Sequence, residues 1–465
     1  MSTGDAAQQA NESADPLRDA VRAGMPAGLD ELAALVAIPS VHDAAVQSLD
    51  DCDRVAERVR AAFDGLGLAS RLVTTSDGSQ AVVATHPAPA GAPTVLLYAH
   101  HDVQPAGDLA AWTSDPWTLT ERQGRLYGRG AADCKGGVVT HLVALRALLD
   151  VHGSFPVGLV VVVEGSEEQG TDGLEQYVST HAADFADVDA AVVMDAGNAA
   201  VGVPALVTTL RGTAFVELRI RALHGTVHSG MFGGAAPDAI ATLVALLATL
   251  RDDAGDTTVD GLDGSQTWDG LPYDADRFAA DAGLLDGAVP IGSGDPASQV
   301  WARPALTVVG IDAPAVAGSS PSVQATAGAA LNLRVPPGVD PAAAGELLVA
   351  HLLRRAPAGV EVAARVTGTG DGFRATAGQY SSAFRSALAS SYRVSSVGSL
   401  GGGGSIPLCA TLERAVPGVE VILAGVSEPT ANVHAPDESV DPSEIEHMAL
   451  AEALFLAGLA PRTSS

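Results

Sequence analysis

Lysine is nearly absent from this sequence of 465 residues: Lys135 is the single lysine, and the other basic residues are arginines. Cysteine is also scarce, and three widely spaced cysteines do not suit a disulfide framework. Aromatic residues make up only 4 % of the chain, so we expect a core of small aliphatic side chains. The sequence has no run with the length and apolarity of a membrane span, and its polar N-terminus does not resemble a signal peptide. These absences predict a reducing, cytoplasmic setting.

The charge balance is strongly acidic, with a net charge of -29 at pH 7. Such a field repels nucleic acid and anionic membranes, so we expect neither as a partner. An acidic surface also keeps a protein in solution, so the charge alone does not indicate a basic partner. Against this background, the one lysine that is kept, Lys135, suggests that a compact ammonium group is needed at its position.

Apolar, β-branched runs alternate with helical patterns in the first half of the chain, which predicts an α/β domain with a mostly parallel central sheet flanked by helices. The runs are 80–85, 94–99, 157–164 and 190–194, and the helical patterns are 137–149 and 172–181. A middle segment differs, with strands at 213–222, 327–335 and 360–366 and helices at 238–250 and 340–353. It predicts an inserted α+β domain. The expected divisions are a disordered N-terminus (1–15), a first catalytic part (16–208), the insert (209–372) and a second catalytic part (373–465).

Polar residues follow three of the predicted parallel strands, where ligands bind in such sheets. His100 and Asp102 follow one strand, Glu167 and Glu168 another, and Asp195 a third. Each pattern has an ordinary explanation when taken alone: paired histidines are often surface residues, and adjacent glutamates often form an exposed turn.

Two further residues extend this set: Asp133 lies in a glycine-rich turn before a helix, and His434 lies in a loop before the last helix. Asp133 alone could be a helix N-cap. Together, two histidines and several carboxylates at one sheet edge suit a pair of divalent ions, most naturally zinc, that share a carboxylate. Ligand type does not exclude Mn²⁺ or Co²⁺.

The motifs resemble those of the di-zinc metallopeptidases that include carnosinase-type dipeptidases, aminoacylase and bacterial N-acyl-amino-acid deacylases. The quoted segments are Tyr98–Pro105, Leu126–Gly137, Val163–Gly170, Val192–Asp195 and Asn432–Glu438, and they occur in family order. The resemblance covers the chain from about residue 30 to about residue 460. Trp301-Ala-Arg-Pro304 and Gln104 favour the dipeptidase branch.

The resemblance implies a role for each residue of the centre. His100 and Asp195 would bind one zinc ion, Glu168 and His434 the other, and Asp133 would bridge the two. Asp102 would support His100. Glu167 would be the general base that takes a proton from a metal-activated water and returns it to the leaving amine.

The resemblance also implies that the insert is a lid and dimerisation domain, so that the protein is a homodimer. His228 would stabilise the oxyanion, reaching into the site of the neighbouring subunit. Arg334 would grip the carboxylate of the substrate, and Gly404 and Ser405 would form a substrate-binding loop. As ordinary alternatives, His228 could lie in a plain turn and Arg334 on a solvated strand.

Three features depart from the family pattern. Cys134 stands where the family usually has Asp or Asn, and His101 adds an imidazole that we expect to point away from His100. Ser322–Ala325 replaces a Thr-x-Ile-Pro segment, which leaves a usual substrate contact in question.

The sequence therefore predicts a metal-dependent dipeptidase that hydrolyses small peptides with a free C-terminal carboxylate. An N-acyl-amino-acid deacylase with the same mechanism is the alternative. A silent metal or peptide binder would not need Glu167, and a structural role would need none of the five motifs.

Overall fold

The computed structural model describes residues 3–460, with side chains from residue 16 onward. The chain forms two compact units. The first comprises Met1–Thr208, Ala375–Leu400 and Leu408–Ser465, and the second comprises Thr209–Arg374 and Gly401–Pro407. The inserted unit thus begins at the expected residue and ends two residues later than expected.

A nine-stranded sheet forms the centre of the first unit, in the order β1-β2-β6-β3-β7-β17-β8-β15, with β16 also paired to β8. Its strands are β1 (Ala69–Thr74), β2 (Gln80–His86), β3 (Thr94–His100), β6 (Gly158–Glu164), β7 (Val188–Val193), β8 (Ala205–Leu210), β15 (Phe373–Arg374), β16 (Gly398–Gly402) and β17 (Glu420–Leu423). The four neighbours β6, β3, β7 and β17 are parallel to one another. The expected mostly parallel sheet is confirmed.

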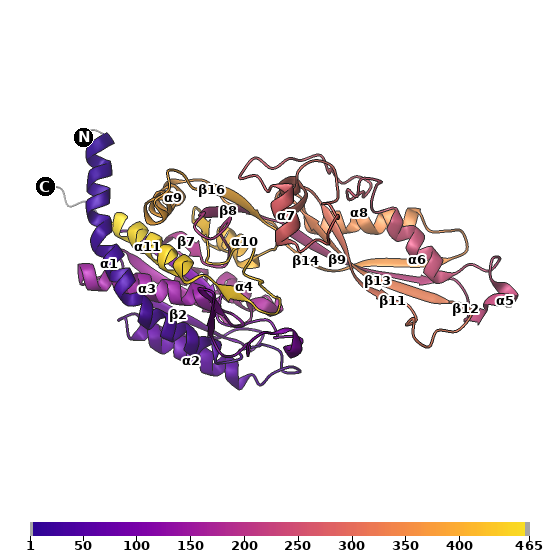
Figure 1. The fold of residues 1–465 in the computed structure, drawn as a ribbon, viewed down its shortest axis with the longest axis horizontal. Coiled ribbons are helices and arrows are strands. Elements are labelled where there is room, and N and C mark those ends of the chain that lie inside the picture. Colours follow the sequence, from indigo (N-terminus) through magenta and orange to yellow (C-terminus); the bar gives the residue numbers. More distant parts are fainter. Residues whose placement is uncertain (1–2, 461–465) are drawn as a thin grey trace. The chain divides into compact units, whose positions relative to one another are not determined.

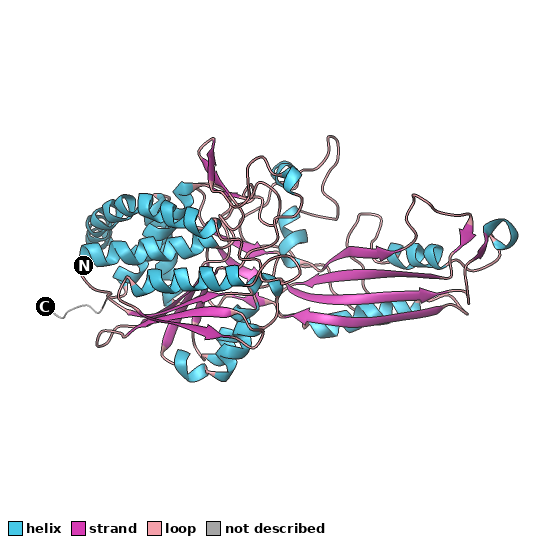
Figure 2. Ribbon diagram, turned by 90° about the horizontal axis from the view of Figure 1, so that it is seen from below, coloured by secondary structure: helices cyan, strands magenta, loops and turns pink. Residues whose placement is uncertain are grey.

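Helices cover this sheet on both faces, and in Figure 2 its strands run between layers of helices. The helices are α1 (Thr3–Val36), α2 (Asp50–Asp64), α3 (Lys135–His152), α4 (Gly173–Thr180), α9 (Gln379–Tyr392), α10 (Pro407–Ala415) and α11 (Pro442–Gly458). Figure 1 shows α1, α3 and α11 side by side. Every residue of β6 is buried, as expected for a parallel strand with both faces covered. A small sheet joins β4 (Thr120–Arg122), β5 (Arg125–Tyr127) and β18 (Ser439–Val440).

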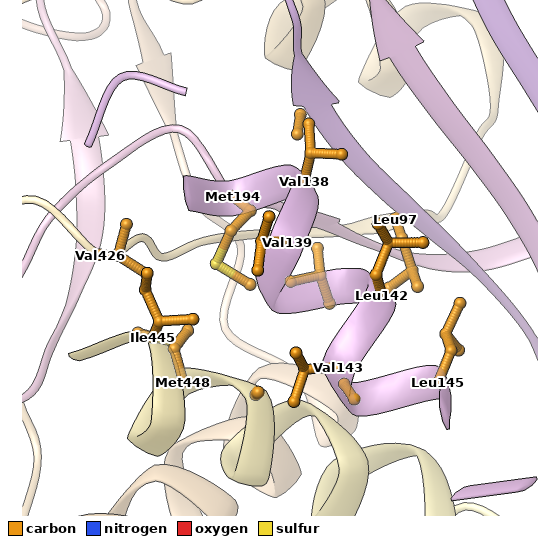
Figure 3. Close-up of a cluster of buried hydrophobic side chains, with 14 of the residues drawn as sticks. Leu97, Val138, Val139, Leu142, Val143, Leu145, Met194, Val426, Ile445 and Met448 are labelled. Carbon is orange, nitrogen blue, oxygen red and sulfur yellow. The ribbon is translucent and has the colours of Figure 1, made fainter. Parts of the chain in front are cut away.

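The core beside α3 fixes the backbone that precedes Asp195, one of the predicted site residues. Figure 3 shows Val139 beside Met194, with Ile445 and Met448 of α11 close by. Met194 is 1 % exposed and directly precedes Asp195. Because protein cores are close-packed, this anchoring limits how far Asp195 can move.

The second unit is built on a four-stranded antiparallel sheet in the order β11-β13-β9-β14. The strands are β9 (Gly212–Arg221), β11 (Ala305–Asp312), β13 (Thr326–Val335) and β14 (Glu361–Gly370), and the helices are α5 (Ser229–Phe232), α6 (Ala239–Ala248), α7 (Ala275–Asp281) and α8 (Pro341–Arg354). A short ladder joins β10 (Val227–His228) to β12 (Ser322–Val323). One face of the main sheet packs against α6 and α8 through Leu218, Leu243 and Leu348.

Three expectations about the fold were wrong. Helix α1 begins at Thr3, whereas we expected disorder over residues 1–15, because Asp15 followed by Pro16 is typical of a helix start. Residues 1 and 2 lie outside the described residues. Alanine and glutamine dominate residues 6–10 and have high helix propensity. Residues 252–298 are rich in glycine and aspartate, which predicts a long loop, but they contain the helix α7. Finally, Gly401–Pro407 belongs to the second unit, because Gly401 lies against Trp301 and Gly402 accepts a hydrogen bond from Arg211 N.

Candidate metal centre

Three parallel strands end at the same edge of the sheet of the first unit. In the register of the sheet, His100 at the end of β3 lies opposite Glu164 at the end of β6, and Tyr98 lies opposite Val193 at the end of β7. The chain crosses from β3 through α3 to β6, and then through α4 to β7 on the other side of β3. Ligands of open α/β sheets bind at such a reversal of strand order.

Asp133 lies between the two histidines. Its Oδ1 is 3.0 Å from Nε2 of His100, and its Oδ2 is 3.0 Å from Nε2 of His434. Asp195 Oδ1 is 3.2 Å from His100 Nε2, and Glu168 Oε2 is 3.1 Å from His434 Nε2. The five residues predicted as metal ligands therefore form one cluster, with Asp133 in the bridging place.

The hydrogen bonds of His100 decide what its Nε2 can do. Nδ1 lies 3.0 Å from the backbone oxygen of Asp102, which can only accept, so Nδ1 carries the proton. The Nε2 lone pair then faces carboxylate oxygens of Asp133 and Asp195. A lone pair and two anionic oxygens repel one another unless a proton or a metal cation lies among them, and a divalent ion fits this donor set. The residues thus fit the metal that the motifs predict.

Asp102 also orders the loop that carries Glu167 and Glu168. Its two carboxylate oxygens accept hydrogen bonds from the backbone N–H groups of these residues, at 3.1 and 3.0 Å. Both glutamates belong to the short helix η2 (Glu167–Gln169). Gln104 Nε2 donates to Glu168 Oε2 at 3.0 Å, a contact that the sequence analysis did not assign.

Burial and neighbouring charges shift the pKa values of three residues of the centre. Burial and the charge of Asp195 raise the pKa of Glu167 well above its usual value. Burial raises the pKa of Asp195 to about 6. Hydrogen bonds to Asp133 and Glu168 raise the pKa of His434 to about 10. Burial is the main cause for the two carboxyl groups, and neighbouring acidic groups add to it. A bound divalent ion would favour the charged form of each.

A buried ion pair beneath the centre was missed by the sequence analysis. Glu438 is fully buried, and Arg129 Nη1 donates to it at 2.7 Å. Glu438 also accepts hydrogen bonds from the backbone N–H groups of Gly130, Ala132 and Asp133, at 3.0 to 3.1 Å. It thereby links the loop of His434 to the turn of Asp133. Both partners lie inside the quoted motifs, but a sequence gives no sign of which charges pair.

The unusual residues of the motifs take structural places. The Cys134 thiol donates to Met194 O at 3.0 Å, although its sulfur lies near the ligand atoms of His100 and Asp195. His101 turns toward β2, where Nε2 donates to Gln80 O at 2.9 Å. Lys135 is buried, and its ammonium donates to Leu35 O and Ile38 O near the end of α1.

The predicted substrate residues lie in the second unit. Arg334 is on β13 opposite Thr213 of β9, and its Nη1 has no hydrogen-bond partner among the described residues. Ser405 Oγ lies near Gly370, and Gly404 precedes it. His228 is exposed at the start of α5, and its Nδ1 accepts from Gly230 N at 3.1 Å, which leaves Nε2 as a donor. Their roles toward a substrate stay predictions.

Comparison with known proteins identifies the family of this chain. The model of peptidase family M20/M25/M40 matches residues 96–457. The chain belongs to this family. The cysteinylglycine-S-conjugate dipeptidase of Corynebacterium striatum is 41 % identical over 460 residues, which cover 98 % of this chain and 99 % of the relative.

Two solved structures share the fold. Human carnosine dipeptidase 1 matches with a TM-score of 0.82 at 23 % identity, covering 96 % of this chain and 98 % of the other. The dipeptidase Dug1p of Saccharomyces cerevisiae matches with a TM-score of 0.82 at 22 % identity, covering 97 % and 99 %. The expected family, fold and type of enzyme, a metal-dependent dipeptidase, are confirmed. None of the described helices is long and apolar enough to cross a membrane.

Proposed function

We propose that this enzyme hydrolyses dipeptides with a free C-terminal carboxylate, with cysteinylglycine and its S-conjugates as the leading substrates. The observation that best supports this reaction is the position of Asp133 between two histidines. Its Oδ1 lies 3.0 Å from His100 Nε2, and its Oδ2 lies 3.0 Å from His434 Nε2. The C. striatum relative supports the substrate, because it resembles this chain over nearly its whole length.

We assign the roles of the centre as follows. His100 and Asp195 would hold one zinc ion, Glu168 and His434 would hold the other, and Asp133 would be the ligand that they share. When bound, such ions lower the pKa of a water molecule and polarise the amide carbonyl. Mn²⁺ or Co²⁺ could take the same places.

The residues around the ions move the proton and orient the substrate. Glu167 accepts a proton from the attacking water and delivers it to the leaving amine, and Asp102 keeps the Glu167 backbone in place. Nε2 of His228 donates to the developing oxyanion. Arg334 and the loop of Gly404 and Ser405 bind the substrate carboxylate and backbone.

The decisive experiment compares the wild-type enzyme with Glu167→Gln on cysteinylglycine, its S-conjugates and N-acetyl amino acids, with and without added zinc. We expect metal-dependent cleavage of dipeptides and a loss of about 10²- to 10⁴-fold in kcat in the variant. Turnover of N-acetyl amino acids in place of dipeptides would assign the deacylase function. A fully active variant would exclude Glu167 as the base.

We further propose a homodimer formed through the second unit, in the cytoplasm. The edge strand β11 is exposed at Val309 and Ile311, and unprotected edge strands invite pairing. The three cysteines are free and buried, which suits a reducing compartment. Sedimentation velocity of the wild type against Val309→Lys tests the dimer: a monomeric variant supports it, and a monomeric wild type refutes it.

A further inference from the structure

Arg211 is a buried cation to which the described part of the chain offers no anionic partner. Arg211 is 8 % exposed, and its Nε and Nη1 atoms have no hydrogen-bond partner among the described residues. Within residues 16–460, no Asp or Glu forms an ion pair with Arg211 or with Arg334. The other two buried arginines have partners: Arg129 pairs with Glu438, and Arg18 donates to Ser390 O and Ser391 O. An unpaired buried guanidinium is costly, so it needs a reason.

The position of Arg211 just before β9 places it near Arg334 of β13. Arg334 lies opposite Thr213 in the β13–β9 ladder, and Arg211 comes two residues before Thr213. Diagonal neighbours across such a ladder are within reach of long side chains. Asn332, two residues before Arg334, donates to Thr213 Oγ1 at 2.7 Å. Thr213, Asn332 and Arg334 share one face of the sheet, whereas Ala214 and Leu333 on the other face are fully buried in the core.

The loop of residues 401–407, which includes Gly404 and Ser405, lies beside Arg211. Arg211 N donates to Gly402 O at 3.3 Å, and a Cβ at position 403 would lie 3.5 Å from Nη2 of Arg211. A Cβ at Gly370, which pairs with Thr213, would lie 3.5 Å from Ser405 Oγ. The loop already assigned to the substrate therefore borders Arg211 as well as the β9 strand.

Electrostatics favour an anion between the two guanidinium groups. Burial lowers the pKa of Arg211 to about 10, and the charge of Arg334 adds to this effect. Both groups still carry their protons at neutral pH and repel each other. A carboxylate offers two oxygens that match the donor fork of a guanidinium, and it would supply the missing negative charge.

We propose that Arg211 is a second guanidinium of the carboxylate site, and that it makes the enzyme require a free C-terminal carboxylate on its substrate. This inference rests on the proposed function, because the ligand is the substrate carboxylate. It assigns a specificity role to a residue outside the five motifs that predicted the centre.

The test compares Arg211→Met with Arg219→Met, an exposed arginine of the same sheet, on cysteinylglycine and its C-terminal amide. We expect Arg211→Met to raise KM for the free acid by at least tenfold, and by about 100-fold if both bonds to the carboxylate are lost. The KM for the amide should stay within twofold, and Arg219→Met should resemble the wild type.

The melting temperature separates specificity from structure. Replacing an unpaired buried charge by an apolar side chain is neutral or stabilising, so the ligand-free Arg211→Met variant should melt at or above the wild-type temperature. A melting temperature several degrees lower, or an unchanged ratio of the free-acid and amide KM values, would overturn the proposal.

A binding measurement on the metal-free protein separates this inference from the proposed function. Saturation-transfer NMR should detect cysteinylglycine binding more strongly than its amide, and Arg211→Met should abolish the difference. That result would support the carboxylate site even if the wild type cleaved no dipeptide. Cleavage by Arg211→Met with undiminished preference for the free acid would overturn the inference and leave the dipeptidase function intact.

Discussion

Ser166 and Asp77 are joined by a hydrogen bond of 2.6 Å between Ser166 Oγ and Asp77 Oδ2. Asp77 lies in the turn between β1 and β2, and Thr171 Oγ1 donates to the same oxygen. Ser166 precedes η2 and Thr171 follows it, so one carboxylate ties both ends of the loop that carries Glu167 and Glu168.

Asp77→Ala should therefore lower kcat for cysteinylglycine by about 10- to 100-fold with little change in KM, because small displacements of reacting groups are costly. Steady-state kinetics measures the effect, with the exposed Asp187→Ala as a control that should match the wild type. An Asp77→Ala enzyme with normal kcat would show that the loop holds its shape without this tie.

The same residue predicts a pH dependence of stability. Burial opposes ionisation of Asp77, but hydrogen bonds from Ser166, Thr171 and Thr75 outweigh it and lower the pKa of the folded state. The unfolded value is about 3.9, so the stabilisation is complete above about pH 5 and is lost as the pH falls below it. The difference in unfolding free energy between wild type and Asp77→Asn should shrink from pH 6 to pH 3. A difference that grows in acid would contradict this sign.

The sequence predicted those residues of the centre that follow the end of a strand or lie in a local motif. Apolar runs that are followed closely by His100, Glu168 and Asp195 implied one sheet edge, and the structure brings these residues together. Contacts between distant segments were invisible, because nothing local marks that Glu438 caps the turn of Asp133 or that Asp77 holds Ser166. Arg211 was missed for a different reason: its importance lies in the lack of a partner, and a sequence does not show which charges stay unpaired.

Glu438 supplies a prediction about stability. Glu438→Ala would leave Arg129 and three backbone N–H groups buried without their acceptor, so we expect a loss of about 3–5 kcal/mol in unfolding free energy. Glu438→Gln keeps the shape and should lose less. Glu446→Ala removes an exposed pair with Arg22 and should change stability by less than about 1 kcal/mol. Urea unfolding measures all three, and equal losses for Glu438→Ala and Glu446→Ala would refute the argument.

Metal removal should lower both activity and thermal stability. A ligand at a thousand times its dissociation constant stabilises the folded state by about 4 kcal/mol, so chelation should lower the melting temperature, and zinc should restore it. In Asp133→Asn, the side chain between His100 and His434 loses its charge and binds metal more weakly. The chelator should therefore have a much smaller effect on this variant. Calorimetry with and without chelator checks this, and an identical shift in wild type and variant would place the stabilising ion elsewhere.

The space around the ammonium group of Lys135 explains why this position holds a lysine and not an arginine. Nζ donates to Leu35 O at 2.9 Å and Ile38 O at 2.8 Å, and the residue is 0 % exposed. A guanidinium is larger and brings five donors to two acceptors, so Lys135→Arg should destabilise the protein by about 1–3 kcal/mol through overpacking and unpaired donors. The reverse exchange on the exposed side of the same helix, Arg146→Lys, should stay within about 0.5 kcal/mol. If Lys135→Arg unfolds at the same urea concentration as the wild type, the fit around the ammonium group does not explain why an otherwise arginine-only chain keeps this lysine.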